Sequence, residues 1–96
     1  MRPSEALESH RQTIREIVKN HRARNARVFG SVLRGTDDEV SDVDLLVDTT
    51  ESTTLLDLGA IQYEVSQLLG VGVDVLTPGA LPDKWRERVL REAQPI

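Results

Sequence analysis

The chain has 96 residues, the length of a single domain, so residues 1–96 are treated as one unit. Its formal net charge of −4 does not favour a broad nucleic-acid-binding surface, and its lack of cysteine excludes disulfides and thiolate metal sites. No apolar run approaches the length of a membrane span, and no apolar segment typical of a signal peptide follows the first residues. We therefore expect a soluble protein of the cytoplasm.

The first predicted element is a helix that opens at Pro3 and Ser4, with Ser4 as its N-cap. Apolar residues recur at helical spacing, with His10 or Arg11 filling the gap, and form one stripe: Leu7, Ile14, Ile17 and Val18. A basic run follows, which we interpret as a solvated connection, with a surface for triphosphate or an acidic partner as the alternative. This run contains Lys19, His21, Arg22, Arg24 and Arg27.

The first predicted strand, residues 26–29, ends in the turn Gly30-Ser31. Glycine lets a ligand approach the backbone, and a serine hydroxyl with free amides at the start of a short helix can hold phosphate. We therefore predict a phosphate site at this turn and one or two helical turns over residues 31–35. Arg34 lies one turn beyond Ser31, where it either faces the same phosphate or pairs with an acid of the next loop.

The second predicted strand, residues 41–47, carries two aspartates. Because side chains alternate along a strand, Asp42 and Asp44 point to one face, with Cα atoms roughly 6.6 Å apart. Their neighbours are apolar, and no Lys or Arg occurs from Thr36 to Glu51 to compensate the two charges. A divalent cation would compensate them, and an all-oxygen site suits Mg²⁺ or Mn²⁺ better than zinc.

The other acids near this strand receive different interpretations. Three consecutive loop acids, residues 37–39, have no apolar anchor except Val40, so we interpret them as solvated charges. Asp48 shares the strand parity of the aspartate pair but lies further along, and we interpret it as a cap of the following loop.

A second long helix is predicted to start at Ser52 or Thr53 and to stop at Gly70. Tyr63 and Gln67 fall outside its apolar stripe and are expected at the surface. The stripe itself consists of Leu55, Leu58, Ile61, Val65, Leu68 and Leu69.

The third predicted strand, residues 71–76, carries Asp74 on the face away from Val73 and Val75. A lone carboxylate on a strand is ambiguous, because exposed strand carboxylates are common. Because the preceding strand carries an aspartate pair, we interpret Asp74 as a third ligand for the same metal.

The last predicted helix covers residues 84–93 and contains Trp85, the largest apolar side chain of the chain. We expect Trp85 in the core, with an interface as the alternative. The elements then follow the order α-β-α-β-α-β-α, which predicts an α/β (α+β) domain.

One motif of this chain resembles the signature of the DNA polymerase beta-like nucleotidyltransferase superfamily. It consists of Gly30-Ser31, ten further residues, and Asp42-Val43-Asp44. The longer stretches 28–35, 41–48 and 73–78 resemble the smallest members of that superfamily, the MNT-type antitoxins. The resemblance covers nearly the whole chain from Ala26 onward. It implies a small mixed β-sheet flanked by helices, with residues 94–96 at the start of a short final strand.

The resemblance also implies nucleotidyl transfer from ATP with two metal ions, Mg²⁺ or Mn²⁺. Asp42 and Asp44 would bridge the ions. Asp74 would bind the second ion and deprotonate the attacking hydroxyl. Gly30 and Ser31 would position the leaving phosphates.

A chain of 96 residues lacks a second domain that could hold an acceptor, so the acceptor is expected on a partner. The resemblance implies the antitoxin of a type VII HEPN/MNT toxin–antitoxin system, which AMPylates a tyrosine of its HEPN ribonuclease toxin. One alternative is an antitoxin that masks the toxin without chemistry, and another is transfer to a small molecule or an RNA end. The preserved motif residues favour the enzyme, because masking needs none of them.

Overall fold

A four-stranded mixed sheet forms the centre of the computed structural model, which describes residues 2–96. Strand β1 pairs antiparallel with β2 and with β4, whereas β2 pairs parallel with β3. The small mixed sheet predicted from the sequence is thereby confirmed. The strands, in the spatial order β3-β2-β1-β4, are β1 (Ala23–Phe29), β2 (Val43–Thr49), β3 (Val73–Leu76) and β4 (Gln94–Pro95).

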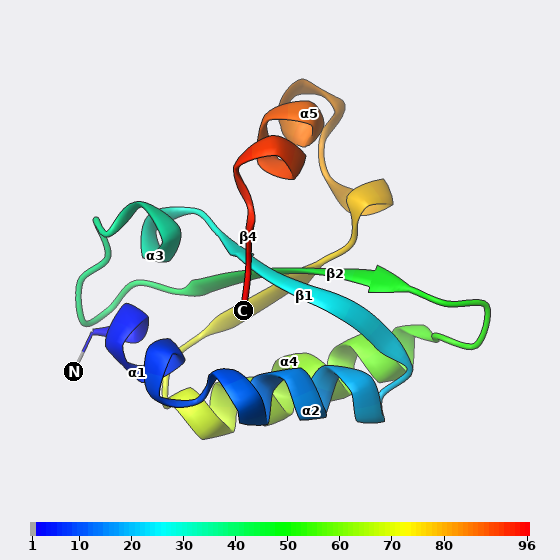
Figure 1. Ribbon diagram of the computed structural model, residues 1–96, viewed down its shortest axis with the longest axis horizontal. Helices are drawn as coiled ribbons and strands as arrows, with labels where there is room; N and C mark the ends of the chain where they lie inside the picture. Colours follow the sequence, from blue (N-terminus) through cyan, green and yellow to red (C-terminus); the bar gives the residue numbers. More distant parts are fainter. Residues whose placement is uncertain (1) are drawn as a thin grey trace.

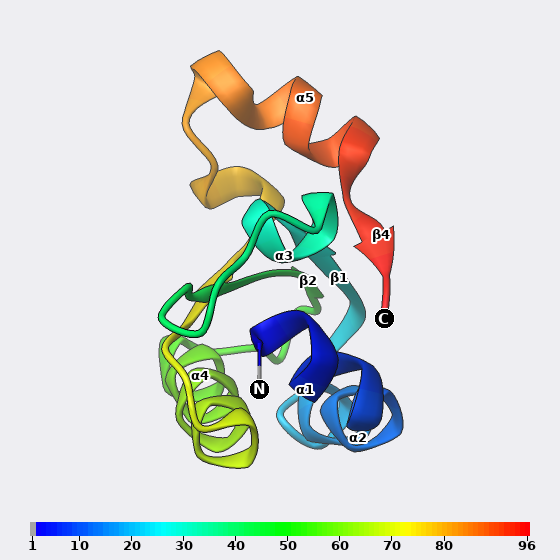
Figure 2. The same cartoon turned by 90° about the vertical axis from the view of Figure 1, so that its left-hand side faces the viewer.

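The helices cover the two faces of this sheet unequally. Three of them pack against one face, whereas the last one stands over the other, which we call the open face (Figures 1 and 2). The packed helices are α1 (Pro3–Ser9), α2 (Arg11–Asn20) and α4 (Leu55–Leu69). The short α3 (Ser31–Arg34) follows β1, and the 3₁₀ turn η1 (Pro78–Ala80) leads to α5 (Asp83–Glu92) on the open face.

Alternation along β2 decides which side chains reach each face. Val43, Leu45 and Val47 are fully buried in the core between the sheet and the packed helices. Asp44 and Leu46 therefore point to the open face, where Leu46 is buried outside that core. Residues of the packed helices that complete the core include Leu7, Ile14, Val18, Ile61, Val65 and Leu69.

The N-terminal segment forms two helices rather than the predicted single helix. The helical conformation is interrupted at His10, which has φ −125° and ψ 20° and lies between α1 and α2. The prediction of Ser4 as N-cap was also wrong, because proline favours the first helical position and α1 already begins at Pro3. The backbone N–H of Ser4 instead donates to Asp37 Oδ2 at 2.9 Å.

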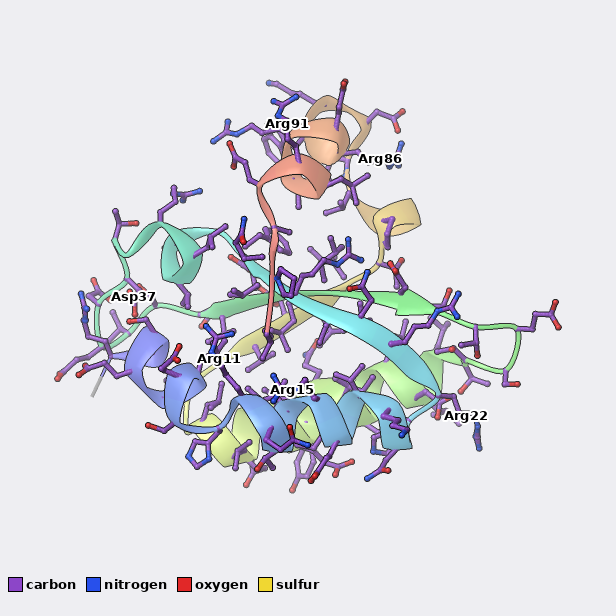
Figure 3. The ribbon with its side chains drawn as sticks, viewed as in Figure 1. Arg11, Arg15, Arg22, Asp37, Arg86 and Arg91 are labelled. Atoms are coloured by element: carbon purple, nitrogen blue, oxygen red, sulfur yellow. The ribbon has the colours of Figure 1, made fainter. Side chains whose placement is uncertain are left out.

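Asp37 is only 4% exposed, so its interpretation as a solvated loop charge was wrong (Figure 3). The first turn of a helix has free N–H donors, and α1 presents one of them to this carboxylate. Burial, the largest single influence, raises the pKa of Asp37. Hydrogen bonds from Ser4 and from the backbone of Asp37 itself, with the charge of Arg2, together outweigh burial, so the net shift of this pKa is downward. Asp37 thereby ties the loop before the aspartate pair to α1.

Strand β1 starts earlier than predicted, and Asp48 differs from its predicted role. The strand begins at Ala23 rather than Ala26, so Arg24 of the basic run belongs to the sheet, as Arg27 does. Arg27 Nη2 lies 2.5 Å from Asp48 Oδ1, and Asn25 Nδ2 donates to Asp48 Oδ2 at 2.8 Å. Asp48 therefore links β1 to β2 instead of capping the following loop.

The boundaries of α4 shift slightly from the prediction. The helix begins at Leu55 after the N-cap Thr54, whose Oγ1 accepts the N–H of Asp57 at 3.2 Å. Leu55 is 86% exposed and does not belong to the buried stripe. Gly70 ends the helix with φ +70°, and Tyr63 is at the surface, both as predicted.

The C-terminal residues return to the sheet, as the resemblance implied. β4 pairs with β1, and Ile96 is buried in the core. Two arginines of α2 hold this end: Arg11 Nη1 donates to the carbonyl of Pro95 at 3.2 Å and Arg15 Nη1 to that of Ile96 at 2.7 Å (Figure 3).

Helix α5 leaves Trp85 51% exposed, so the expectation of a core tryptophan was wrong. The helix has no buried residue, because it stands over the open face instead of packing within the core. Within residues 2–96, no helix combines the length and the apolar composition that a membrane crossing requires.

Replacing Leu45 tests whether the core supports β2. Leu45 is fully buried, so Leu45→Ala should lower the free energy of unfolding by about 2–5 kcal/mol in urea denaturation. Val40 is 87% exposed, and Val40→Ala should change that free energy by less than about 0.5 kcal/mol. Equal effects of the two substitutions would contradict the described core.

Candidate active site

The turn between β1 and α3 depends on Gly30. This residue has φ +78°, and a Cβ built on it would lie 2.2 Å from Asp44 Oδ2. Only glycine therefore allows the Asp44 carboxylate to lie against this backbone. The predicted helical turns after Gly30 are present as α3, which starts at Ser31.

Asp44 and Asp74 are direct neighbours in the parallel pairing of β2 with β3. Paired residues of adjacent strands point to the same face, about 4.8 Å apart across the hydrogen-bonding direction. The pKa of Asp44 is raised, first by burial and then by the negative charges of Asp74 and Asp42, while the Arg34 guanidinium acts in the opposite direction. The sheet thus brings repelling carboxylates together on its open face.

Asp42 lies just before β2 and is exposed. A Cβ on Gly72 would lie 2.4 Å from Asp42 Oδ1, so the missing side chain leaves the space that this carboxylate uses. Asp42 and Asp74 also line a common cavity at the edge of the sheet, together with Tyr63. Gly72 was not predicted as part of the site, although a glycine within the predicted strand 71–76 signals a close approach of another group.

The three aspartates match a divalent metal in donor chemistry. Carboxylate oxygens are the ligands that Mg²⁺ and Mn²⁺ prefer. Burial and then the negative charges of Asp74 and Asp42 raise the pKa of Asp44, and a cation would neutralise those charges. As the side chains stand in residues 2–96, no three of His, Cys, Asp or Glu are arranged to hold an ion. Holding one therefore requires side-chain rotation, above all of Asp42, which is turned toward Gly72.

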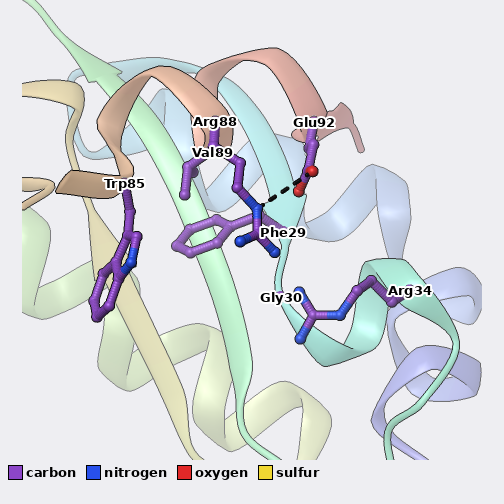
Figure 4. Close-up of a pocket in the computed structure, with 7 residues that line it drawn as sticks. All are labelled: Phe29, Gly30, Arg34, Trp85, Arg88, Val89 and Glu92. Atoms are coloured by element: carbon purple, nitrogen blue, oxygen red, sulfur yellow. Dashed lines mark ion pairs between the residues drawn. The ribbon is translucent and has the colours of Figure 1, made fainter.

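The sequence left open whether Arg34 faces a phosphate or pairs with a loop acid. Within residues 2–96 it forms no ion pair with a loop acid. Its side chain lines a cavity beside Gly30, and the backbone N–H of Arg34 donates to the Gly30 carbonyl at 3.1 Å (Figure 4). A guanidinium therefore lies next to the predicted phosphate turn.

The structure thus places the glycine turn beside the two aspartates, the arrangement that the sequence motif led us to expect of an enzyme that transfers nucleotides. The chain belongs to the nucleotidyltransferase domain family, whose model matches residues 7–96. A solved structure described as a candidate minimal nucleotidyltransferase is 43% identical, with a TM-score of 0.86, and the match covers 97% of this chain and 95% of that one.

Two curated relatives carry adenylyltransferase names. MJ0435 of Methanocaldococcus jannaschii, named as a candidate protein adenylyltransferase, is 40% identical over 80% of this chain and 83% of the relative. MntA of Thermococcus cleftensis, a protein adenylyltransferase, is 37% identical over 90% of this chain and 84% of the relative. A toxin–antitoxin structure with AMP-PNP aligns over 83% of this chain and 66% of its own at a TM-score of 0.70, and its 16% identity shows the fold alone.

Gly30 and Gly35 provide a matched pair of substitutions. Both have positive φ, +78° and +73°, but Gly35 is left-handed with ψ 19°, whereas Gly30 has ψ −152°, a region that essentially only glycine adopts. Alanine should therefore cost roughly 1–2 kcal/mol of stability at Gly35 and roughly 1–3 kcal/mol at Gly30. Gly35 has open space around it, whereas alanine at Gly30 would displace Asp44. Gly30→Ala should therefore lower nucleotidyl transfer by roughly 10²-fold, and Gly35→Ala should leave it nearly unchanged once both variants are shown to be folded. Equal transfer by the two variants would contradict the contact.

Asp44→Asn should stabilise the metal-free fold. The folded pKa of Asp44 lies above its ordinary value of 3.8, so ionised Asp44 destabilises the fold above that folded pKa. The variant should exceed the wild type in free energy of unfolding at pH 7 with EDTA. The difference should shrink as the pH falls through the folded pKa toward 3.8.

Urea denaturation at pH 7 and pH 4 measures this difference, with Glu51→Gln as the control at an exposed acid. Adding Mg²⁺ should stabilise the wild type more than Asp44→Asn, because only the wild type keeps the full carboxylate set. A variant less stable than the wild type at pH 7 without metal would show that Asp44 is not under charge repulsion.

Proposed function

We propose that the chain is a metal-dependent protein adenylyltransferase and the antitoxin of a toxin–antitoxin pair. It transfers AMP from ATP to a tyrosine of a partner HEPN ribonuclease toxin in the cytoplasm. The observation that carries this proposal is the placement of Asp44 beside both Asp74 and Gly30. The adenylyltransferase name of MntA and the toxin–antitoxin neighbour with AMP-PNP support it.

The residues divide into a nucleotide side and an acceptor side. Gly30 contacts Asp44 and lines one cavity, whereas Asp42 and Asp74 line the other. ATP phosphates at the turn Gly30-Ser31 would place the α-phosphorus over the carboxylates, with an acceptor hydroxyl entering from the side of Asp74. Each substrate thus has its own approach to the same carboxylates.

In the proposed reaction, the tyrosyl oxygen forms a bond to the α-phosphorus while the bond to the pyrophosphate oxygen breaks. Asp74 accepts the tyrosyl proton, and Arg34 offsets charge on the departing phosphates. Two divalent cations held by Asp42, Asp44 and Asp74 would supply charge neutralisation and a lowered pKa of the attacking hydroxyl. These residues otherwise act by positioning, which can supply much of the rate of such a transfer.

The proposal is tested by intact-mass analysis of the partner toxin after incubation with this protein, ATP and Mg²⁺. The wild type should add one AMP to the toxin, on tyrosine by peptide mapping. The double variant Asp42→Asn/Asp44→Asn should add none within the detection limit, since both carboxylates hold the metal. Gly35→Ala serves as the control variant, because a side chain at this position contacts none of the three aspartates.

The same experiment separates catalysis from masking. Inhibition of the ribonuclease by the double variant, without any mass gain, would favour an antitoxin that acts by binding alone. Mass gain on the toxin with the double variant would overturn the assignment of the two aspartates.

A further inference from the structure

Trp85 is the only tryptophan of the chain, and half of its surface faces solvent. Large aromatic side chains usually bury most of their surface, so this exposure calls for a ligand or a partner. Lys84 Nζ lies over the indole ring, 5.9 Å from its centroid, and Trp85 also lines a cavity. A flat aromatic surface is therefore available on α5.

A cavity of about 350 Å³ separates α5 from the turn between β1 and α3. The end of β1, the turn and α3 line one side of it with Phe29, Gly30 and Arg34. Helix α5 lines the other with Trp85, Arg88, Val89 and Glu92 (Figure 4). Its volume lies within the range of about 300–1,000 Å³ typical of small-molecule sites. Aromatic rings and guanidinium groups thus face one space.

We propose that this cavity holds the nucleoside of the nucleotide substrate, with Trp85 stacking on the base and Arg88 contacting a phosphate. The inference rests on the proposed function and adds α5 to the nucleotide site. Gly30 belongs both to the cavity wall and to the contact with Asp44. A ligand with its phosphates at Gly30 therefore extends from the carboxylates into the cavity.

The charges of the cavity favour a phosphorylated ligand. Arg34 from α3 and Arg88 from α5 bring two guanidinium groups to the cavity, against one lining carboxylate, Glu92, in a molecule whose net charge is −4. Arg88 Nε lies 3.4 Å from Glu92 Oε1, an exposed pair four residues apart on α5. Such pairs contribute little, so Arg88 can exchange Glu92 for a phosphate at small cost.

The cavity is held open by contacts of α5 with the preceding turn. Arg86 Nε donates to the carbonyl of Pro78 at 2.9 Å, and its Nη2 donates to that of Leu81 at 2.7 Å (Figure 3). Leu81 is buried, so these bonds fix the start of α5 to the turn η1, which follows β3. Trp85 and Arg88 are therefore positioned before any ligand binds.

The single tryptophan provides a direct measurement on the wild-type protein. Titration with ATP and Mg²⁺ should change the emission of Trp85 in a saturable manner, because the base stacks on its ring. Tripolyphosphate, which shares only the phosphate chemistry, should bind at the turn with a much smaller change in emission.

Calorimetry on variants of α5 extends the test. Trp85→Ala should weaken ATP binding by roughly 5- to 100-fold, as expected for the loss of one stacked base, and Trp85→Phe should retain most of the affinity. Arg88→Ala should weaken binding of ATP more than that of adenosine. Leu90→Ala, on the same helix but outside the cavity lining, should match the wild type.

Two outcomes would overturn the inference. If Trp85→Ala binds ATP like the wild type and the emission of Trp85 responds only to the toxin, α5 is a protein-binding element, while AMP transfer to the toxin continues to support the proposed function. If neither ATP binding nor transfer occurs, the proposed function fails and this inference fails with it.

Discussion

The parallel pairing of β2 with β3 is the constraint on which the site depends. The core takes Val43 and Leu45 on one face, so strand alternation forces Asp44 onto the other. The register then sets Asp44 beside Asp74, and Gly30 lets the carboxylate lie against the turn that follows β1. Apolar burial on one side of a thin sheet thus generates concentrated negative charge on the opposite side.

This arrangement holds repelling charges in place at the expense of the fold's own stability. The raised pKa of Asp44 shows that its ionised form is disfavoured there, with Arg34 as the opposing cation. Shifted pKa values are common in sites that bind a cation or stabilise a developing charge, because the ligand supplies the compensating charge that the folded chain lacks. A metal ion bound with the nucleotide would neutralise the carboxylate charges on the open face.

The parts of the site that are local in sequence could be predicted from it. The glycine turn, the spacing of Asp42 and Asp44, and the α/β order follow from residue types and alternation. The failures concern long-range packing: Asp37 is buried because α1 folds over its loop, and Trp85 is exposed because α5 leaves the core. The periodicity of the loop around Asp37 and of the helix around Trp85 predicts neither the burial of the first nor the exposure of the second. The position of Asp74 depended on a strand register that only the structure provides.

The proposed function requires Asp42, Asp44 and Asp74 to share a divalent cation beside the glycine turn. Anomalous diffraction from crystals grown with Mn²⁺ and a non-hydrolysable ATP analogue can locate that cation. We expect a manganese peak within coordination distance of carboxylate oxygens of all three residues, with the phosphates next to Gly30. A bound nucleotide whose manganese is held elsewhere, with these carboxylates uncoordinated, would contradict it.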